Sequence, residues 1–102
     1  MSYYTHRPIT SWAEEDKPRE KLLKRGISSL TDAELLGILF GTGTRENSAI
    51  DLGRKVLEEV GSLQQLARTD VRELMKIKGI GKAKAVALVS AFELARRKGT
   101  LT

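Results

Sequence analysis

The sequence predicts an all-α domain of about five to six short helices, because apolar residues recur with a helical period and no segment alternates like a strand. The clearest helical stripe consists of Ala49, Leu52, Gly53, Val56, Leu57 and Val60. Glycines and capping residues also interrupt the chain at short intervals, as the ends of short helices do. The 102 residues suit one domain and are too few for two.

The chain is expected to divide at about residue 16 into an arm and a helical domain. Residues 1–15 show no clear period, so an N-terminal arm that packs across the domain is predicted there, with Trp12 as a core anchor. Residues 16–102 are predicted to form the helical domain. Its first helix has Pro18 in the first turn and ends at Gly26.

Later helices are expected to begin directly after Thr31, Ser48, Ser62 and Asp70. Glu or Gln stands three positions after Thr31, Ser62 and Asp70, which is the spacing of a capping box. The first of these helices is expected to break at residues 41–43, and the second to stop at Gly61. A last helix is predicted to start after Gly81 and to run to about Lys98.

The formal net charge of +5 is unevenly distributed along the chain. Residues 1–73 carry 11 Lys and Arg against 12 Asp and Glu, whereas residues 74–102 carry 7 Lys and Arg against Glu93 alone. Such asymmetry indicates a contact with a polyanion at one end of the fold. Solvated lysines that only aid solubility are an equally good interpretation of the charge by itself.

The most informative segment is residues 74–85, which read Leu-Met-Lys-Ile-Lys-Gly-Ile-Gly-Lys-Ala-Lys-Ala. This is the helix-hairpin-helix pattern, in which two glycines enclose an apolar residue between two helices. Gly79 can take the positive φ that ends a helix, and Ile80 can bury its side chain between the helices. Gly81 has no Cβ, so the backbone there can come close to a ligand.

The backbone amides after Gly81 are expected to lie at a helix N-terminus, where they have no partner within the helix and where the helix dipole is positive. They form a candidate phosphate site. Lys78, Lys82 and Lys84 would surround the phosphate with positive charge, and Ala83 is expected to keep the second helix close to the first. A tight helical turn with no ligand is the alternative interpretation.

An earlier segment, residues 36–43, repeats the pattern of a helix followed by Gly-x-Gly. It departs from the second copy because Thr42 replaces the apolar residue and residues 44–48 lengthen the turn. Two hairpins, over about 32–60 and 70–98, predict a tandem helix-hairpin-helix bundle whose hairpins can hold phosphates on both sides of a minor groove. The contact candidates of the first copy are Thr42, Gly43, Thr44 and Arg45.

Motifs spread over nearly the whole chain also follow a recognisable order. They are Trp12, residues 16–23 (DKPREKLL), 30–36 (LTDAELL), 41–44 (GTGT), 48–49 with Leu52, 61–63 (GSL) and 76–81 (KIKGIG). In this order they resemble the N-terminal domain of the RadC family, bacterial proteins labelled as DNA repair factors. The resemblance implies a role associated with DNA repair.

Typical members of that family continue into a domain that resembles JAB/MPN metalloproteases, with a zinc site made of a His-x-His pair and a downstream Asp. His6 is the only histidine of this chain and no Asp follows Asp70, so the chain is expected not to be an enzyme, and to be either an excised domain or a truncated relative. A DNA glycosylase would also need an Asp beyond the hairpin, and the last acidic residue here is Glu93.

The favoured function is therefore DNA binding through the phosphate backbone, without reading sequence. The alternative is a protein-interaction module that docks the family's C-terminal JAB/MPN-like domain, with apolar contacts near Ile9, Trp12 and Phe40. No cofactor is expected, although carbonyls near residues 76–81 are candidates for a monovalent cation, as in some related hairpins. The chain has no cysteine, no apolar span and no secretion signal, so a cytoplasmic location without a membrane partner is expected, and the oligomeric state stays open.

Overall fold

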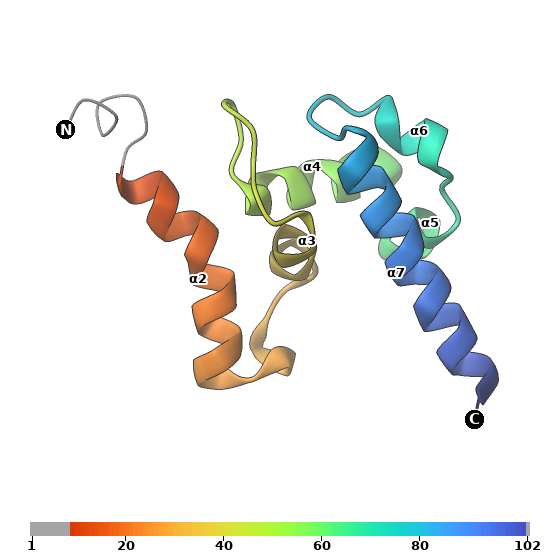
Figure 1. Ribbon diagram of the computed structural model, residues 1–102, viewed down its shortest axis with the longest axis horizontal. Coiled ribbons are helices and arrows are strands. Elements are labelled where there is room, and N and C mark those ends of the chain that lie inside the picture. Colours follow the sequence, from red (N-terminus) through yellow and green to blue (C-terminus); the bar gives the residue numbers. More distant parts are fainter. Residues whose placement is uncertain (1–8, 102) are drawn as a thin grey trace.

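The computed structural model describes the backbone of residues 9–101 and the side chains of residues 17–99. Within this part of the chain every regular element is a helix, which confirms the predicted all-α class (Figure 1). In chain order the elements are α2 (Ile9–Arg25), the 3-10 helix η1 (Ile27–Ser29), α3 (Asp32–Phe40), α4 (Ala49–Val60), α5 (Leu63–Ala67), α6 (Val71–Met75) and α7 (Lys82–Leu101). None of the helices in the described segment is long and apolar enough to cross a membrane.

The start of the first helix differs from the prediction, because α2 begins at Ile9 rather than after residue 15. Pro18 therefore lies in the helix interior and not in its first turn. A proline at this place cannot donate a backbone hydrogen bond, but its ring is fully buried, and this burial offsets part of the loss. The side chain of Trp12, expected to anchor the core, lies outside the described residues.

The helix starts at Thr31, Ser48, Ser62 and Asp70 are confirmed, and each side chain accepts a hydrogen bond from a backbone N–H three residues on. Thr31 forms a complete capping box: its Oγ1 accepts from the N–H of Glu34 at 3.2 Å, and Glu34 Oε1 accepts from the N–H of Thr31 at 2.9 Å. Local chemistry thus fixes where these short helices begin.

Two helical pairs form most of the fold. α3 and α4 are joined by residues 41–48, α6 and α7 are joined by residues 76–81, and α5 links the pairs. α3 and α4 pack closely at Gly53, where a Cβ would come within 2.6 Å of the carbonyl oxygen of Ala33. Both connecting segments lie at the same edge of the molecule (Figure 1). The fold therefore brings the two Gly-x-Gly segments of the sequence to one side.

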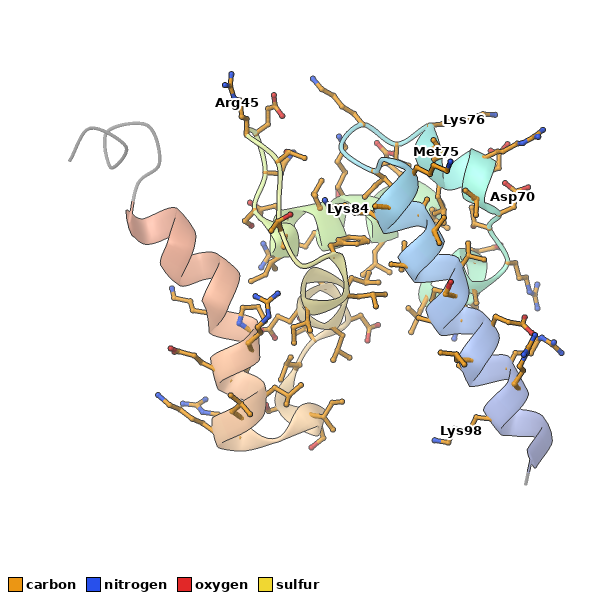
Figure 2. All side chains as sticks on the ribbon, in the orientation of Figure 1. Arg45, Asp70, Met75, Lys76, Lys84 and Lys98 are labelled. Atoms are coloured by element: carbon orange, nitrogen blue, oxygen red, sulfur yellow. The ribbon has the colours of Figure 1, made fainter. Side chains whose placement is uncertain are left out.

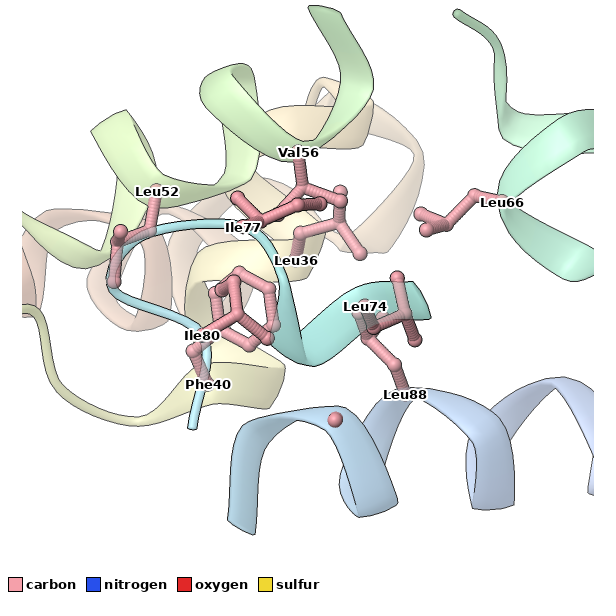
Figure 3. Close-up of a cluster of buried hydrophobic side chains, with 10 residues drawn as sticks. Leu36, Phe40, Leu52, Val56, Leu66, Leu74, Ile77, Ile80 and Leu88 are labelled. Carbon is pink, nitrogen blue, oxygen red and sulfur yellow. The ribbon is translucent and has the colours of Figure 1, made fainter. Parts of the chain in front are cut away.

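A single apolar core runs through both pairs (Figure 3). Its buried members are Leu36, Phe40, Leu52, Val56, Leu66, Leu74, Ile77, Ile80, Ala85 and Leu88. Every helix from α3 to α7 contributes to this core, and so does the segment 76–81 itself. Because the connecting segment is anchored in the core, its backbone is held by packing and not only by its own hydrogen bonds.

Candidate nucleic-acid interface

The segment 76–81 is a tight hairpin that reverses the chain between α6 and α7. The N–H of Lys76 bonds to the carbonyl of Glu73 at 3.2 Å, the N–H of Ile77 to that of Leu74 at 3.1 Å, and the N–H of Ile80 to that of Ile77 at 3.0 Å. These consecutive short turns use the amides on the inner side of the hairpin. The amides that follow Ile80 belong to the start of α7 and take no part in these turns.

Gly79 and Ile80 take the roles predicted for them. Gly79 has a φ of 96°, a region that side-chain-bearing residues rarely adopt. A Cβ at Gly79 would also come within 2.7 Å of Leu52 Cδ2, so a side chain there would displace Leu52 in addition to straining the backbone. Ile80 is 2% exposed and lies in the core, as expected of the residue between the two glycines.

Gly81 differs from Gly79 because the protein itself does not require a glycine there. Its φ is not in the left-handed region, and a Cβ built on it meets no heavy atom of the described chain within 4 Å. Gly81 is also exposed. The missing side chain therefore leaves the outer face of the hairpin backbone open to a ligand.

The amides of residues 81–84 form the polar part of the candidate interface. The first bond of α7 runs from the N–H of Ala85 to the carbonyl of Gly81 at 3.0 Å, and the structure as described gives the amides before it no acceptor. α3, α4, α5 and α6 each have a side-chain cap, but the residue before α7 is a glycine. These amides point their dipoles outward at the positive end of a 20-residue helix.

The charges around the start of α7 are positive. Lys78 and Lys82 are exposed, Lys84 is half-buried, and the first turn of α7 contains no acidic residue. Cations at a helix N-terminus oppose the helix dipole, whereas α3, α4 and α6 have acidic residues in their first turns. An anion between the lysines and the amides would remove this electrostatic conflict.

The packing role expected of Ala83 is wrong. Ala83 is exposed, and the alanine that allows α7 to approach its neighbours is Ala85, which is fully buried. The two residues lie about 200° apart around a helix, so they face nearly opposite sides. Ala83 instead leaves a small side chain on the open surface beside the free amides.

The basic residues of the last 29 positions do not form one patch, so the expectation of a single charged end holds only in part. Lys84 and Lys98 lie toward opposite ends of α7 (Figure 2), about 21 Å apart along the helix axis at about 1.5 Å per residue. Near the far end, Glu93 pairs with Arg96 at 2.6 Å and with Arg97 at 2.9 Å. Only the lysines near the hairpin belong to the candidate interface.

The first connecting segment, residues 41–48, is also a turn that depends on glycine. Gly41 ends α3 with a φ of 81°. A Cβ on Gly43 would collide with the backbone of Asn47 and Ser48, so the packing of the loop explains this glycine without a ligand. The backbone N–H of Thr44 donates to the carbonyl of Asn47 at 2.8 Å, and Thr44 Oγ1 accepts from the N–H of Asn47 at 3.2 Å.

Of the candidates in this first segment, Arg45 and Thr42 are the ones exposed at the surface. Arg45 lies at the tip of the loop, at the same edge of the molecule as the 76–81 hairpin (Figure 2). The hydroxyl of Thr44 is used inside the loop, both by Asn47 and in a 3.4 Å hydrogen bond that it donates to Glu46. Arg45 is therefore the stronger contact candidate of this copy.

One residue of the interface was not predicted from the sequence. Lys55, in α4, donates from its Nζ to the carbonyl oxygen of Lys78 at 3.1 Å. It follows Leu52 by three residues, and side chains at this spacing share a helix face. A lysine beside an apolar stripe is common on amphipathic helices, so no local pattern indicates that this one reaches a segment 23 residues away.

The apolar residues exposed in the structure differ from those expected for the alternative function, docking of a protein domain. Phe40, expected as an apolar contact, is only 8% exposed and belongs to the core, while the side chains of Ile9 and Trp12 lie outside the described residues. Other large apolar side chains are exposed instead, most strongly Leu23 (82%) and Leu94 (69%). They lie on α2 and α7, away from the 76–81 hairpin.

Fold and site define a small all-helical domain with two glycine-dependent loops at one edge, one of them opening into an uncapped helix with a basic first turn. Comparison with known proteins assigns this arrangement to a family: residues 9–86 match the model described as UPF0758 N-terminal. The chain belongs to the UPF0758 N-terminal family. No solved structure gives a significant match.

Relatives from several organisms are named UPF0758 protein. The chain is 48% identical over 94 residues to the one from Flavobacterium johnsoniae, which covers 92% of the chain and 41% of the relative. It is 53% identical over 83 residues to the one from Rubrobacter xylanophilus, covering 81% and 37%, and 49% identical over 87 residues to the one from Methanosarcina mazei, covering 85% and 38%. The chain thus spans about two-fifths of the length of these relatives.

Proposed function

We propose that this domain binds DNA through its phosphate backbone, without sequence specificity and without catalysis of its own. The observation that carries the proposal is the start of α7: the amides of residues 81–84 have no acceptor in the described chain, no side chain covers Gly81, and Lys78 and Lys82 stand exposed beside them. Backbone amides at a helix N-terminus, with lysines around them, match the charge and geometry of a phosphate.

Phosphate contacts position a protein on DNA but do not distinguish bases. With about 3–5 phosphates neutralised, the affinity is expected to fall by about one to three decades between low and near-physiological salt. The resemblance to RadC-family proteins supports an association with DNA repair and points to a helix-hairpin-helix mode of binding. Arg45, at the same edge as the hairpin, is proposed to contact a second phosphate across the minor groove.

The test is a titration of the isotope-labelled domain with short duplex DNA at low ionic strength, followed by amide NMR. Resonances of residues 79–84 are expected to move first, and Lys82→Glu with Lys84→Glu is expected to weaken binding by about tenfold or more. A charge-matched control is Lys17→Glu with Lys24→Glu, because both lysines are exposed and lie on α2. If the two double variants lose the same affinity, or if amides 79–84 stay unmoved, the proposal is wrong.

A second candidate function is docking of another protein domain, with the C-terminal, JAB/MPN-like part of longer relatives as the proposed partner. The exposed apolar side chains favour it, because Leu23, Ile27 and Leu94 are each more than 60% exposed. Substitution of Leu23 and Leu94 by Gln distinguishes the two functions. If the domain docks a partner, the leucine variants lose binding of that partner and keep their DNA affinity. If it binds DNA, the lysine variants lose DNA affinity and keep any binding of the partner.

A further inference from the structure

The carbonyl oxygen of Lys78 is the starting point for an inference about how the hairpin is held. No backbone N–H of the described residues donates to this oxygen, whereas the carbonyl of the preceding residue, Ile77, accepts from the N–H of Ile80. Its donor is the ammonium group of Lys55, at 3.1 Å. Lys55 belongs to α4, and thus to the other helical pair.

α4 holds the hairpin by two residues that lie one turn apart. Leu52 packs against Gly79 so closely that a Cβ there would overlap it, and Lys55, one turn later on the same face, bonds to the carbonyl of Lys78. One contact is apolar and the other is a charge-assisted hydrogen bond. Together they fix the position of the backbone immediately before Gly81 and the free amides.

We propose that Lys55 is a positioning residue that supplies the hairpin with its own cation. An ammonium group bonded to the Lys78 carbonyl already supplies a positive charge at that oxygen, and this charge disfavours a monovalent cation at the same place. The hairpin is therefore ready to bind phosphate without a bound metal ion. This inference deepens the proposed DNA binding and rests on it for its functional consequence, but its structural part concerns the free protein.

The charge of Lys55 has a second effect on the same site. A carbonyl oxygen near a phosphate site repels the incoming anion, and an ammonium that bonds to that oxygen screens it. Lys55 is half-exposed and is not a member of the core, to which α4 contributes Leu52 and Val56, so its loss is not expected to disrupt the core. The effect of substitution is therefore expected on hairpin geometry and affinity and not on the fold.

The first experiment uses no DNA. Lys55→Ala is expected to shift the amide resonances of residues 78–81 and to speed their hydrogen exchange, while the core amide of Leu88 stays unchanged. Lys55→Arg, which keeps the charge and the donors, is expected to keep the wild-type pattern. Lys24→Ala, which removes one exposed lysine from α2, is the matched control. If the amides of Lys55→Ala do not move, the proposal is wrong.

The second experiment measures DNA affinity at one ionic strength in potassium chloride and in tetramethylammonium chloride. The unmodified domain is expected to bind equally in both salts. Lys55→Ala is expected to lose roughly fivefold in tetramethylammonium and less in potassium, because a potassium ion can reach the vacated carbonyl. The slope of log affinity against log salt is expected to stay unchanged, since Lys55 does not touch a phosphate.

Two outcomes would overturn the inference. A slope that falls by about one in Lys55→Ala, with unmoved free-state amides, would make Lys55 a direct phosphate contact. A preference of the unmodified domain for potassium would mean that the ammonium does not replace the ion. If the unmodified domain fails to bind DNA while Lys55→Ala still shifts the hairpin amides, DNA binding is rejected and the positioning role of Lys55 remains.

Discussion

Leu52, a core side chain of α4, packs directly against Gly79 in the hairpin that opens α7, because a Cβ built on Gly79 would lie 2.7 Å from Leu52 Cδ2. This contact joins the two helical pairs at the point where the candidate interface begins. The apolar core and the candidate phosphate site are therefore not separate parts of the molecule. Substitutions in one have consequences for the other, and the contact gives the first prediction.

Gly79→Ala is expected to destabilise the domain by about 1–3 kcal/mol or more, because it adds the strain of a positive φ to an overlap with Leu52. Gly61→Ala is the matched control. Its φ of +110° imposes similar strain, but a Cβ there meets nothing within 4 Å. Urea unfolding followed by circular dichroism measures both. An equal cost for the two variants would show that the contact with Leu52 is unimportant for stability.

Gly81→Ser is expected to stabilise the domain and to weaken DNA binding at the same time. Serine is a better N-cap than glycine by a few tenths of a kcal/mol, and its hydroxyl would occupy one of the amides proposed to bind phosphate. The open space around Gly81 accommodates the new side chain. Thermal unfolding and a fluorescence binding titration give the two readouts. Tighter or unchanged DNA binding would argue against amide contacts at this helix start.

Leu74→Ala is expected to cost about 2–5 kcal/mol, because Leu74 is completely buried where α6 meets the shared core. Since the core is continuous through both helical pairs, unfolding is expected to remain a single transition. Denaturant unfolding monitored by amides in α4 and in α7 tests this. Separate midpoints for the two helices would show that the pairs unfold independently.

Glu93 gives a prediction for pH. Hydrogen bonds from Arg96 and Arg97 lower the pKa of the Glu93 carboxyl from 4.5 to about 2. Because the folded-state pKa lies below the ordinary value, the ion pairs favour the folded helix above about pH 4.5, and this contribution is lost as the pH falls toward 2. The carboxyl carbon resonance of Glu93, followed by NMR as the pH is lowered, is expected to show a titration midpoint near pH 2.

The Arg96→Gln, Arg97→Gln double variant is the control for this titration. With both guanidinium groups removed, the pKa of Glu93 is expected to return toward 4.5. A midpoint near 4.5 in the unmodified domain would show that the ion pairs do not persist in solution. These groups lie at the far end of α7 from the hairpin, so DNA affinity is not expected to follow their titration.

Local features of this fold could be predicted from the sequence because a few neighbouring residues determine them. The caps at Ser62 and Asp70 and the left-handed turn at Gly79 are of this kind, since each depends on residues within four positions. The length of α2 could not be predicted in the same way. Pro18 normally marks a helix start, and burial of its ring in the tertiary structure overrides this preference.

Features that depend on contacts between distant elements were missed or misassigned. The bond from Lys55 to Lys78 joins residues 23 positions apart, and no local pattern encodes it. The exchange of roles between Ala83 and Ala85 has a similar cause, because the predicted start of α7 is right but packing against the other helices decides which alanine faces the core. The division of the basic residues of α7 into two groups follows from the length of the helix, which the net charge of residues 74–102 does not take into account.

The continuous core has one more consequence for the edge that carries Arg45 and the 76–81 hairpin. The 76–81 hairpin contributes Ile77 and Ile80 to the core, and the 41–48 loop is flanked by the buried Phe40 and Ala49. Packing therefore holds the two loops at a fixed spacing. If the domain binds DNA as proposed, strands whose phosphates already match that spacing would be favoured, and others would have to bend to fit. Selectivity among shapes of nucleic acid would then arise without any reading of bases.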